Sequence, residues 1–411
     1  MRNFNIAALF YLVFVAIACS QTYYVDANAG KDSNDGLSPS TAWQSLAKAS
    51  STSVKSGSKV LLRRGCEWRG QIVVPADNIT YSAYGEGAKP VVNASRIIGG
   101  WSRHSGSIYK ATVPFEVNSV YCDGEYQELA HWPDDDWLLT DENSTSGDYI
   151  IDNDLSAPDS ILGAGIVVRT KEHMLVNSSV TSHNANRVGY DLASSIATIN
   201  SQYYFNNKLW MLDRPGEWFY DKADQTLYLW PKSGKDPNGA LLEVPEFNCG
   251  ISIFRKGITM ENIAVMLPSQ HGVIAAGKAD SLVLRDLDIR KIRSYGILIL
   301  DLYSDSLVER CKVTDCGLNG IMIVRGSRCI IRDNVVQDIG MEGRFPELNA
   351  TAGIFFSDYE DVTIAGNRIS RMSKGGIVGG HAKAIIRNNV IDQVMLRFND
   401  NGGIYLCGDG S

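Results

Sequence analysis

Residues 386–391 are Ile-Arg-Asn-Asn-Val-Ile, and the same pattern stands at residues 364–369 as Ile-Ala-Gly-Asn-Arg-Ile and at residues 331–336 as Ile-Arg-Asp-Asn-Val-Val. Asn334, Asn367 and Asn389 occupy the same place in the three copies. Two earlier copies, at residues 284–289 and 308–313, carry Leu287 and Cys311 there. A pattern that returns at a fixed spacing indicates a repeat architecture.

A glycine followed by an apolar residue returns in step with this pattern. The copies are Gly250-Ile251, Gly272-Val273, Gly296-Ile297, Gly320-Ile321, Gly353-Ile354, Gly376-Ile377 and Gly403-Ile404. The gaps of 22, 24, 24, 33, 23 and 27 residues give a base period of about 23 residues, interrupted by two insertions.

Both columns fit a stacked coil in which each turn carries short β-strands that pair with the next turn about 4.8 Å away. Small and β-branched residues would point inward, and each glycine would mark a corner where no side chain fits. Asparagines at one corner could form a hydrogen-bonded ladder. The Leu-x-x-Leu-x-Leu pattern of leucine-rich repeats is missing from these turns. The sequence therefore predicts an all-β fold, a right-handed parallel β-helix.

Composition excludes some partners. The chain has 411 residues, of which 44% are hydrophobic, and 39 basic against 46 acidic residues give a net charge of −7. Without a basic block, nucleic acid is not expected as a partner. The eight cysteines show no zinc-binding spacing. We expect no cofactor, with calcium as an open possibility if the protein is a lyase.

Residues 1–20 have the features of an export signal, with Arg2 ahead of an apolar run at residues 6–18 that is too short to span a bilayer. Ala16-Ile17-Ala18 before Cys19 permits two outcomes: ordinary signal cleavage, or lipidation of Cys19 in a bacterium. We therefore expect an exported protein, whether secreted, periplasmic or an outer-membrane lipoprotein. A lipid on Cys19 would be its sole membrane contact, and we expect a monomer.

The region ahead of the repeat divides into a cap and an insertion. Ser38 suits an N-cap and Pro39 the first position of a short helix with Trp43, Leu46 and Ala47 on one face, which would cap the coil. Residues 21–96 would then hold this cap and the first turns of the β-helix. Residues 97–248 are expected to form an inserted β-rich domain, since all eight tryptophans lie at or before Trp230 and residues 216–231 have the pattern of a hairpin. The repeat then covers residues 249–411, and it stops within a turn, as a fragment would.

Several segments outside the repeat carry a resemblance. They are the run from Tyr23 to Pro39, Ala130-His131-Trp132-Pro133, and the run from Leu212 to Asp221. On these segments the chain resembles secreted right-handed parallel β-helix proteins of polysaccharide-degrading bacteria, within the pectate-lyase-like superfamily, and β-helix glycoside hydrolases in particular. The resemblance implies this architecture and a polysaccharide or oligosaccharide substrate. Because the group includes hydrolases and lyases, it leaves the reaction open.

The fifth residue after each repeat glycine from Gly272 onward forms a polar column among apolar neighbours. Its members are Gly277, Asp301, Arg325, Asp358, His381 and Gly408. Asp301 and Asp358 would lie two turns apart, about 9–10 Å, close to the separation of about 6.5–9.5 Å that inverting glycosidases use. Arg325 could bind substrate, and His381 could act as a further acid or base. The alternative explanation of the column is a set of solvated charge pairs on a turn.

Other residues complete the predicted site. Glu360 and Asp400 are alternative carboxylates, while Phe355, Tyr405 and Trp132 are candidate substrate contacts, with Trp137 a further sugar-stacking candidate. The leading hypothesis is a glycoside hydrolase with a carboxylate acid/base pair. The alternatives are a polysaccharide lyase acting by β-elimination on a uronate polymer, and a non-catalytic carbohydrate-binding surface protein.

Overall fold

The computed structural model describes residues 20–171, 174–191, 196–302, 305–341 and 351–407. The predicted signal segment up to residue 19, with Cys19, lies outside them, as does most of the insertion in the 33-residue gap. Within the described residues, no helix has the length and apolar character needed to cross a membrane.

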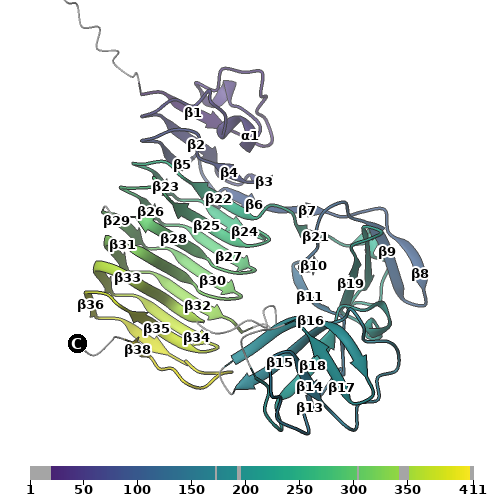
Figure 1. Cartoon of the computed structure of the whole chain (residues 1–411). Helices are drawn as coiled ribbons and strands as arrows, with labels where there is room; N and C mark the ends of the chain where they lie inside the picture. Colours follow the sequence, from purple (N-terminus) through teal and green to yellow (C-terminus); the bar gives the residue numbers. More distant parts are fainter. Residues whose placement is uncertain (1–19, 172–173, 192–195, 303–304, 342–350, 408–411) are drawn as a thin grey trace, which may run out of the picture.

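The molecule is built on a coil of parallel strands (Figure 1), and each complete turn adds one strand to each of three stacks. The first stack contains β4 (Ile72–Val73), β22 (Cys249–Ile253), β25 (His271–Ala276), β28 (Ile297–Leu302), β31 (Ile321–Arg332), β33 (Ala352–Ala365), β35 (Gly375–Gly380) and β38 (Ile404–Cys407). The second contains β1 (Thr22–Val25), β2 (Lys59–Arg63), β5 (Thr80–Tyr84), β23 (Thr259–Glu261), β26 (Val283–Arg285), β29 (Ser306–Glu309), the ends of β31 and β33, and β36 (Ala384–Arg387). The third contains β3 (Glu67–Arg69), β6 (Val91–Asn93), β24 (Ala264–Met266), β27 (Asp288–Ile292), β30 (Lys312–Cys316), β32 (Val335–Ile339), β34 (Arg368–Met372) and β37 (Val390–Asp392).

Stacking of like residues holds the coil together. Ile297, Ile321, Ile354 and Ile377 follow the repeat glycines, pair in register from turn to turn and are fully buried. A Cβ added to Gly296 would lie 2.4 Å from Val313 and 2.6 Å from a carbonyl oxygen of the next turn. The glycine column therefore marks positions where neighbouring stacks leave no room for a side chain, as the repeat predicts.

The predicted asparagine ladder is present. The side-chain amides of Asn334 and Asn367 donate to the side-chain oxygens of Asn367 and Asn389 at 2.9 Å each, and the backbone N–H of Cys311 donates to Asn334. Each buried amide thus satisfies backbone and side-chain groups of the adjacent turn, which fixes the register. Cys311 and the other cysteines of the described residues are free thiols.

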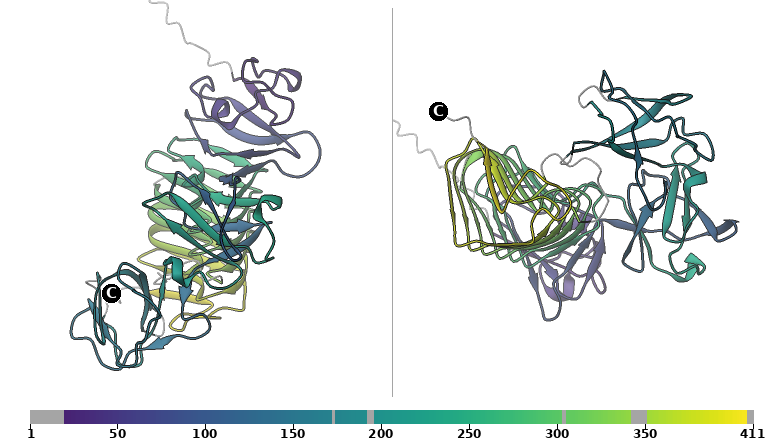
Figure 2. Two further views of the ribbon diagram at one scale, coloured as in Figure 1. Left: turned by 90° about the vertical axis from the view of Figure 1, so that its right-hand side faces the viewer. Right: turned by 90° about the horizontal axis from the view of Figure 1, so that it is seen from below.

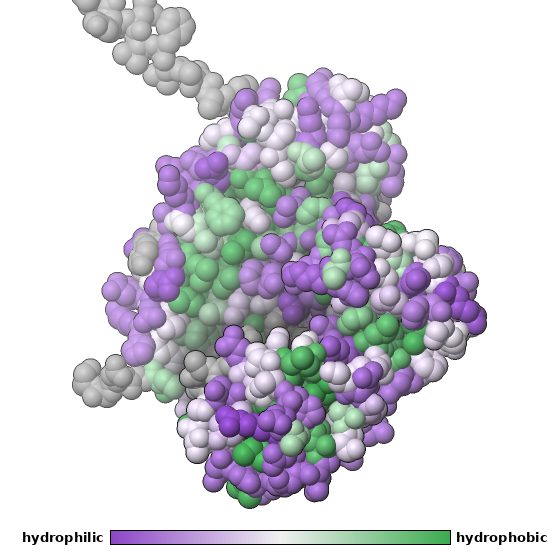
Figure 3. Space-filling view, turned by 45° about the vertical axis from the view of Figure 1, so that its right-hand side comes forward, coloured by the Kyte–Doolittle hydropathy of each residue, from purple (hydrophilic) through white to green (hydrophobic). Residues whose placement is uncertain are grey.

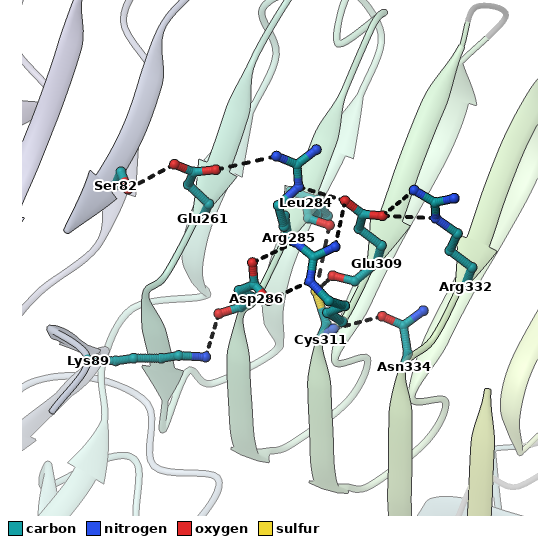
Figure 4. Close-up of polar contacts among 11 residues, drawn as sticks. Ser82, Lys89, Glu261, Leu284, Arg285, Asp286, Glu309, Cys311, Arg332 and Asn334 are labelled. Atoms are coloured by element: carbon teal, nitrogen blue, oxygen red, sulfur yellow. Dashed lines mark hydrogen bonds and ion pairs between the residues drawn. The ribbon is translucent and has the colours of Figure 1, made fainter. Parts of the chain in front are cut away.

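A second ladder, of charges, runs along the end of the second stack (Figure 4). Arg285 and Arg332 donate to the Glu309 carboxylate at 2.7 and 2.6 Å, and Arg310 lies 3.1 Å from it. The Glu309 side chain is 3% exposed. Desolvation alone would raise the pKa of Glu309, but the hydrogen bonds from Arg332 and Arg285 outweigh it and hold that pKa below its ordinary value.

The N-terminal cap differs in detail from its prediction. Ser38 does cap a turn that begins at Pro39, but η1 (Pro39–Thr41) is a single 3-10 turn, and α1 (Leu46–Ala49) starts separately with Ser45 as its cap. Trp43 is extended instead of helical, because its N–H and carbonyl pair with Tyr24 and Asp26 of the first turn. Ala47 is consequently exposed, and the predicted single helical face is wrong.

The inserted domain, residues 94–248, leaves the coil after β6 and rejoins it at β22. One antiparallel-rich sheet contains β7 (Ser95–Ile97), β8 (Ser102–Ser105), β9 (Ile108–Thr112), β10 (Val120–Cys122), β11 (Glu125–Leu129), β19 (Glu217–Asp221), β20 (Thr226–Trp230) and β21 (Leu242–Pro245). The other contains β12 (His131–Trp132), β13 (Leu138–Leu139), β14 (Tyr149–Ile151), β15 (Gly165–Lys171), β16 (Met174–Asn184), β17 (Arg187–Tyr190) and β18 (Gln202–Asn206). The turns η2 (Leu209–Met211) and η3 (Pro237–Gly239) connect these strands.

The inserted domain lies beside the third stack, on one flank of the coil (Figure 2). The predicted hairpin is confirmed, since β19 and β20 pair antiparallel from Glu217–Trp230 to Asp221–Thr226. The predicted fold class, a parallel β-helix with a β-rich insertion, is confirmed as a whole.

Candidate functional site

Asp301, Arg325, Asp358 and His381 do form one row, here called the corner row. Val324 and Gly326 of β31 pair with Ser357 and Tyr359 of β33, which places Arg325 beside Asp358, and the neighbouring strands continue this register in both directions. All four residues have positive φ angles between 50° and 57°. They therefore make the sharp left-handed corner between the first and second stacks, a conformation that aspartate tolerates better than most residues.

The corner row is open to solvent and internally paired. Arg325 donates to Asp301 at 2.6 Å, and the two side chains are 56% and 42% exposed. His381 Nδ1 lies 3.7 Å from Asp358 Oδ1, again with both side chains about half exposed. The hydrogen bond from Arg325 lowers the pKa of Asp301. A carboxylate held ionised in this way suits a base or an ion pair better than a general acid.

The remaining predicted residues are dispersed. Glu360 is exposed beyond the corner, and Asp400 lies in the exposed loop that follows β37, near the buried Lys374. Phe355 and Tyr405 project from one outward column of the first stack, with Val378 between them. Trp132 packs on Phe205 and Trp210 in the core of the inserted domain. The corner row and these residues are therefore not gathered into one site.

A large cavity lies elsewhere, between the inserted domain and the third-stack side of the coil; Figure 3 shows the hollow. We call it the cleft; its volume is about 1330 Å³. The corner row does not line it. Its carboxylates are Glu116, Glu125, Glu128, Asp134, Asp135, Asp136 and Asp315. Its aromatic side chains are Tyr126, Trp137, Tyr204, Trp218 and Tyr220.

One wall of the cleft carries a charged network, here called the cleft network: Glu128, His131, Arg214 and Glu217. Arg214 contacts Glu128, Glu217 and His131 Nε2 at 3.1, 3.3 and 3.0 Å. It also donates to the backbone oxygen of Asp134 at 3.2 Å. The arginine thus fixes the loop that carries the carboxylates at positions 134–136.

Glu217 is the buried anchor of this network, with its side chain 1% exposed and 3.3 Å from His131 Nδ1. Burial lowers the pKa of His131, but the hydrogen bond and charge of Glu217 outweigh it and raise that pKa above its ordinary value. His131 lines the cleft, so an imidazole whose pKa is raised by Glu217 faces that space.

The coil forms the opposite wall. Lys291 donates to the backbone oxygen of Gly124 and lies 5.6 Å from the ring centroid of Tyr121, which fastens β27 to the inserted domain. Phe398, in the loop after β37, packs with Val167 of β15 and Leu175 of β16 in the inserted domain. The inserted domain is therefore held to the coil at separate points.

Two segments of the earlier resemblance converge in the cleft network. His131 comes from one, and Arg214 and Glu217 come from the other, 83 and 86 residues further along the chain. Repeat analysis could not find them, because they lie outside the periodic part. Their one signal was the placement of ionisable residues within these two segments. In the described residues, no cluster of histidine, cysteine and carboxylate side chains suits a metal ion.

Comparison with known proteins agrees with this architecture. Residues 246–391 match the model of the right-handed β-helix region, and residues 192–232, within the inserted domain, match a model described as the GH141 insertion domain. No curated protein sequence is a significant match. The predicted likeness to β-helix glycoside hydrolases is confirmed by these family models together with the solved structures below.

Two solved structures are similar over most of this chain. One, titled a glycoside hydrolase, has a TM-score of 0.73 at 12% identity and covers 95% of each chain. The other, XylC in complex with xylose, has a TM-score of 0.53 at 15% identity and covers 94% of this chain and 65% of that one. At these identities the likeness shows a shared fold that includes both the coil and the insertion.

Proposed function

We propose that this protein is a glycoside hydrolase that binds a polysaccharide or oligosaccharide in the cleft. The cleft carries the proposal: it is a large concave site in which carboxylates, aromatic rings and a histidine face one space. The match to the GH141 insertion domain supports it, because Arg214 and Glu217 of the cleft network lie within the matched residues. The solved neighbours, a glycoside hydrolase and a xylose complex, point to the same class of substrate.

The inserted domain supplies the groups for acid/base chemistry. Hydrolysis of a glycosidic bond needs one group to protonate the leaving oxygen and a carboxylate to attack the sugar or activate water. Asp134 lines the cleft, and one of its carboxyl oxygens is buried without a hydrogen-bond partner among the described residues. The residue as a whole is partly exposed toward the cleft, so we assign its carboxylate to contact with the substrate. His131, whose pKa Glu217 raises, is the proposed proton donor; for this step its Nε2 must exchange Arg214 for the leaving oxygen of the substrate.

Trp137 supplies the proposed sugar platform. It lines the cleft half-buried and rests edge-on against Tyr204, with ring centroids 4.9 Å apart. A ring fixed by a second ring presents its face at low conformational cost, and such faces suit the apolar faces of sugars.

The test is turnover on a panel of plant and algal polysaccharides, with products followed both as new reducing ends and by ultraviolet absorbance. We expect new reducing ends without an absorbance change, and a fall of at least about 100-fold in Asp134→Asn and His131→Gln, in keeping with the usual contribution of a general acid or base. Trp137→Ala should raise KM more than it lowers kcat.

The matched controls are Asp301→Asn and Asp358→Asn, which remove the same kind of charge from the corner row. They should keep wild-type turnover. Activity lost in these two variants and kept in Asp134→Asn would move the site to the corner. Unsaturated, ultraviolet-absorbing products would instead establish β-elimination, and binding without any product would leave a carbohydrate-binding protein.

A further inference from the structure

The ring of Tyr204, which lines the cleft, packs against two of the side chains on which the proposed function depends. Its centroid lies 4.9 Å from that of Trp137 with the ring planes at 79°, and 5.8 Å from that of His131 with the planes at 70°. Both are edge-to-face contacts, an arrangement that aromatic rings favour at centroid distances of about 4.5–7 Å. A single ring therefore contacts both the proposed proton donor and the proposed sugar platform.

Strand β18 places Tyr204 beneath the segment that carries these two side chains. His131 of β12 pairs with Asn206, and Leu138 of β13, the residue after Trp137, pairs with Tyr203. The segment between His131 and Leu138 is thus attached to β18 at both ends, and Tyr204 lies between the two points of attachment. Because side chains alternate along a strand and Tyr203 is buried in the core of the inserted domain, Tyr204 is directed to the other face, toward the cleft.

The polar contacts of His131 do not by themselves fix its ring during proton transfer. Nε2 lies 3.0 Å from Arg214, the contact that must be given up when Nε2 meets the leaving oxygen. The contacts with Glu217 and with the backbone oxygen of Leu129 are both made at Nδ1. Contacts at one nitrogen allow the ring to tilt about it, so a packing contact from another direction is what keeps Nε2 in place.

The ring of Tyr204 is in turn supported by the coil. Together with Trp137 and Leu318 it packs against the small cluster that contains Phe398, and both Leu318 and Phe398 belong to the coil. Burial raises the pKa of Tyr204 to about 12, so its phenol stays protonated and uncharged at neutral pH. Tyr204 therefore acts on its neighbours through its shape.

We propose that Tyr204 is a positioning residue, whose ring holds the imidazole of His131 and the indole of Trp137 at a fixed spacing so that both act on the same bound sugar chain. The inference rests on the proposed function, from which it takes the roles of His131 and Trp137. It assigns no chemical step to Tyr204, and it requires the ring but not the hydroxyl. Fixed geometry of this kind matters because a displacement of about 1 Å can lower a rate by about 100-fold.

The first test compares two substitutions of Tyr204 with a matched control. Tyr204→Leu, which removes the ring, should lower kcat by about 10-fold to 100-fold and raise KM severalfold. Tyr204→Phe, which keeps the ring, should stay within about threefold of wild type in both constants. The control is Tyr228→Leu, since Tyr228 also packs against a histidine, His104, and an aromatic ring, Phe219, but does not line the cleft. It should keep the kinetics of wild type.

Double variants separate positioning from a general loss of structure. If Tyr204 acts through Trp137, adding Tyr204→Leu to Trp137→Ala should raise KM no further but should still lower kcat through His131. If it acts through His131, adding Tyr204→Leu to His131→Gln should lower kcat no further but should still raise KM. Residues that act independently have additive effects. Full additivity in both pairs would therefore overturn the proposal, as would a loss of activity in Tyr204→Phe equal to that in Tyr204→Leu.

A measurement without turnover keeps this inference apart from the proposed function. NMR relaxation of the Trp137 indole N–H, assigned by its loss in Trp137→Ala, should give an order parameter near about 0.85 in wild type and Tyr204→Phe and below about 0.6 in Tyr204→Leu. An indole that stays rigid in a folded Tyr204→Leu variant would overturn the positioning role even if hydrolysis is found. A mobile indole with no hydrolysis of any glycan would overturn the proposed function and leave Tyr204 as the residue that orders Trp137.

Thermal unfolding shows whether each variant is folded. If Tyr204→Leu is not, Tyr204→Met takes its place in every comparison, because methionine keeps apolar bulk in the cluster but has no ring plane. The same outcomes then decide.

Discussion

The corner row and the cleft network both place acidic and basic side chains together, but the chain brings these side chains together in different ways. In the corner row, each charge follows the last by one turn of the coil and is paired in the open solvent. In the cleft network, charges from two separate segments meet around a buried glutamate and face a cavity. The corner row is what a repeat produces by itself, whereas the cleft network requires the chain to leave the repeat and return.

The charge ladder on the second stack helps to interpret the corner row. Glu261, Arg285, Glu309 and Arg332 alternate in sign from turn to turn, as Asp301, Arg325 and Asp358 do. The ladder residues do not line the cleft. Ion pairing between adjacent turns is therefore a sufficient explanation for alternating charge along a column. If the turns paired one turn out of register, like charges would lie side by side.

The largest effect is expected when the buried carboxylate of the cleft network is removed. Glu217→Gln leaves Arg214 and His131 without the carboxylate that holds them, and we expect a loss of about 3 kcal/mol of stability in the inserted domain. It should also lower the pKa of His131, because Glu217 is what raises it. Denaturant unfolding and an NMR titration of His131 measure the two effects. An unchanged histidine titration would show that the carboxylate does not act on it.

A somewhat smaller loss of stability is expected when a packing contact between the coil and the inserted domain is removed. Phe398 is 4% exposed in a small cluster with Val167 and Leu175. Phe398→Ala should cost about 2 kcal/mol, less than truncation of a phenylalanine in a full core. It should also raise KM and speed proteolysis of the loop that follows β37.

Phe254→Ala is the control for this prediction, since that ring lies on the coil and is 46% exposed. Its stability and proteolysis should be close to wild type. If the two variants behave alike, the inserted domain does not depend on Phe398 for its place against the coil.

The charge ladder tests whether burial makes such an alternating column stabilising. It has the same alternation of charge as the corner row, but one member, Glu309, is buried. Glu309→Gln should cost about 2 kcal/mol at neutral pH, below the range for fully buried pairs because its arginine partners are half exposed. The folded-state pKa of Glu309 is lowered, so its stabilisation is present above the unfolded value of about 4.3 and is lost as pH falls through the folded value.

The difference in stability between wild type and Glu309→Gln should therefore shrink when unfolding is measured in acid instead of at neutral pH. A difference that stays constant across this range would mean that the glutamate contributes through shape and not through charge.

The coil could be predicted from the sequence because each turn repeats the same sequence pattern. The glycine column, the asparagine ladder and the corner row each follow from one period and the pairing of like positions. The cleft could not be predicted in this way, since it depends on how the inserted domain lies against the third stack. His131 and Arg214 are 83 positions apart in the chain and come into contact only through folding. No periodic spacing in the sequence predicts that contact.

The smallest expected effect belongs to the corner row. Asp301→Asn removes the charge that pairs with Arg325 but keeps a residue type that accepts the left-handed corner. An exposed ion pair contributes little, because water solvates both groups well and ordering two side chains costs entropy. We therefore expect no measurable loss of stability and no loss of turnover. Asp301→Ala, which strains the corner as well, should be less stable than Asp301→Asn. Reduced turnover in Asp301→Asn at unchanged stability would assign the corner row a role that pairing between turns does not explain.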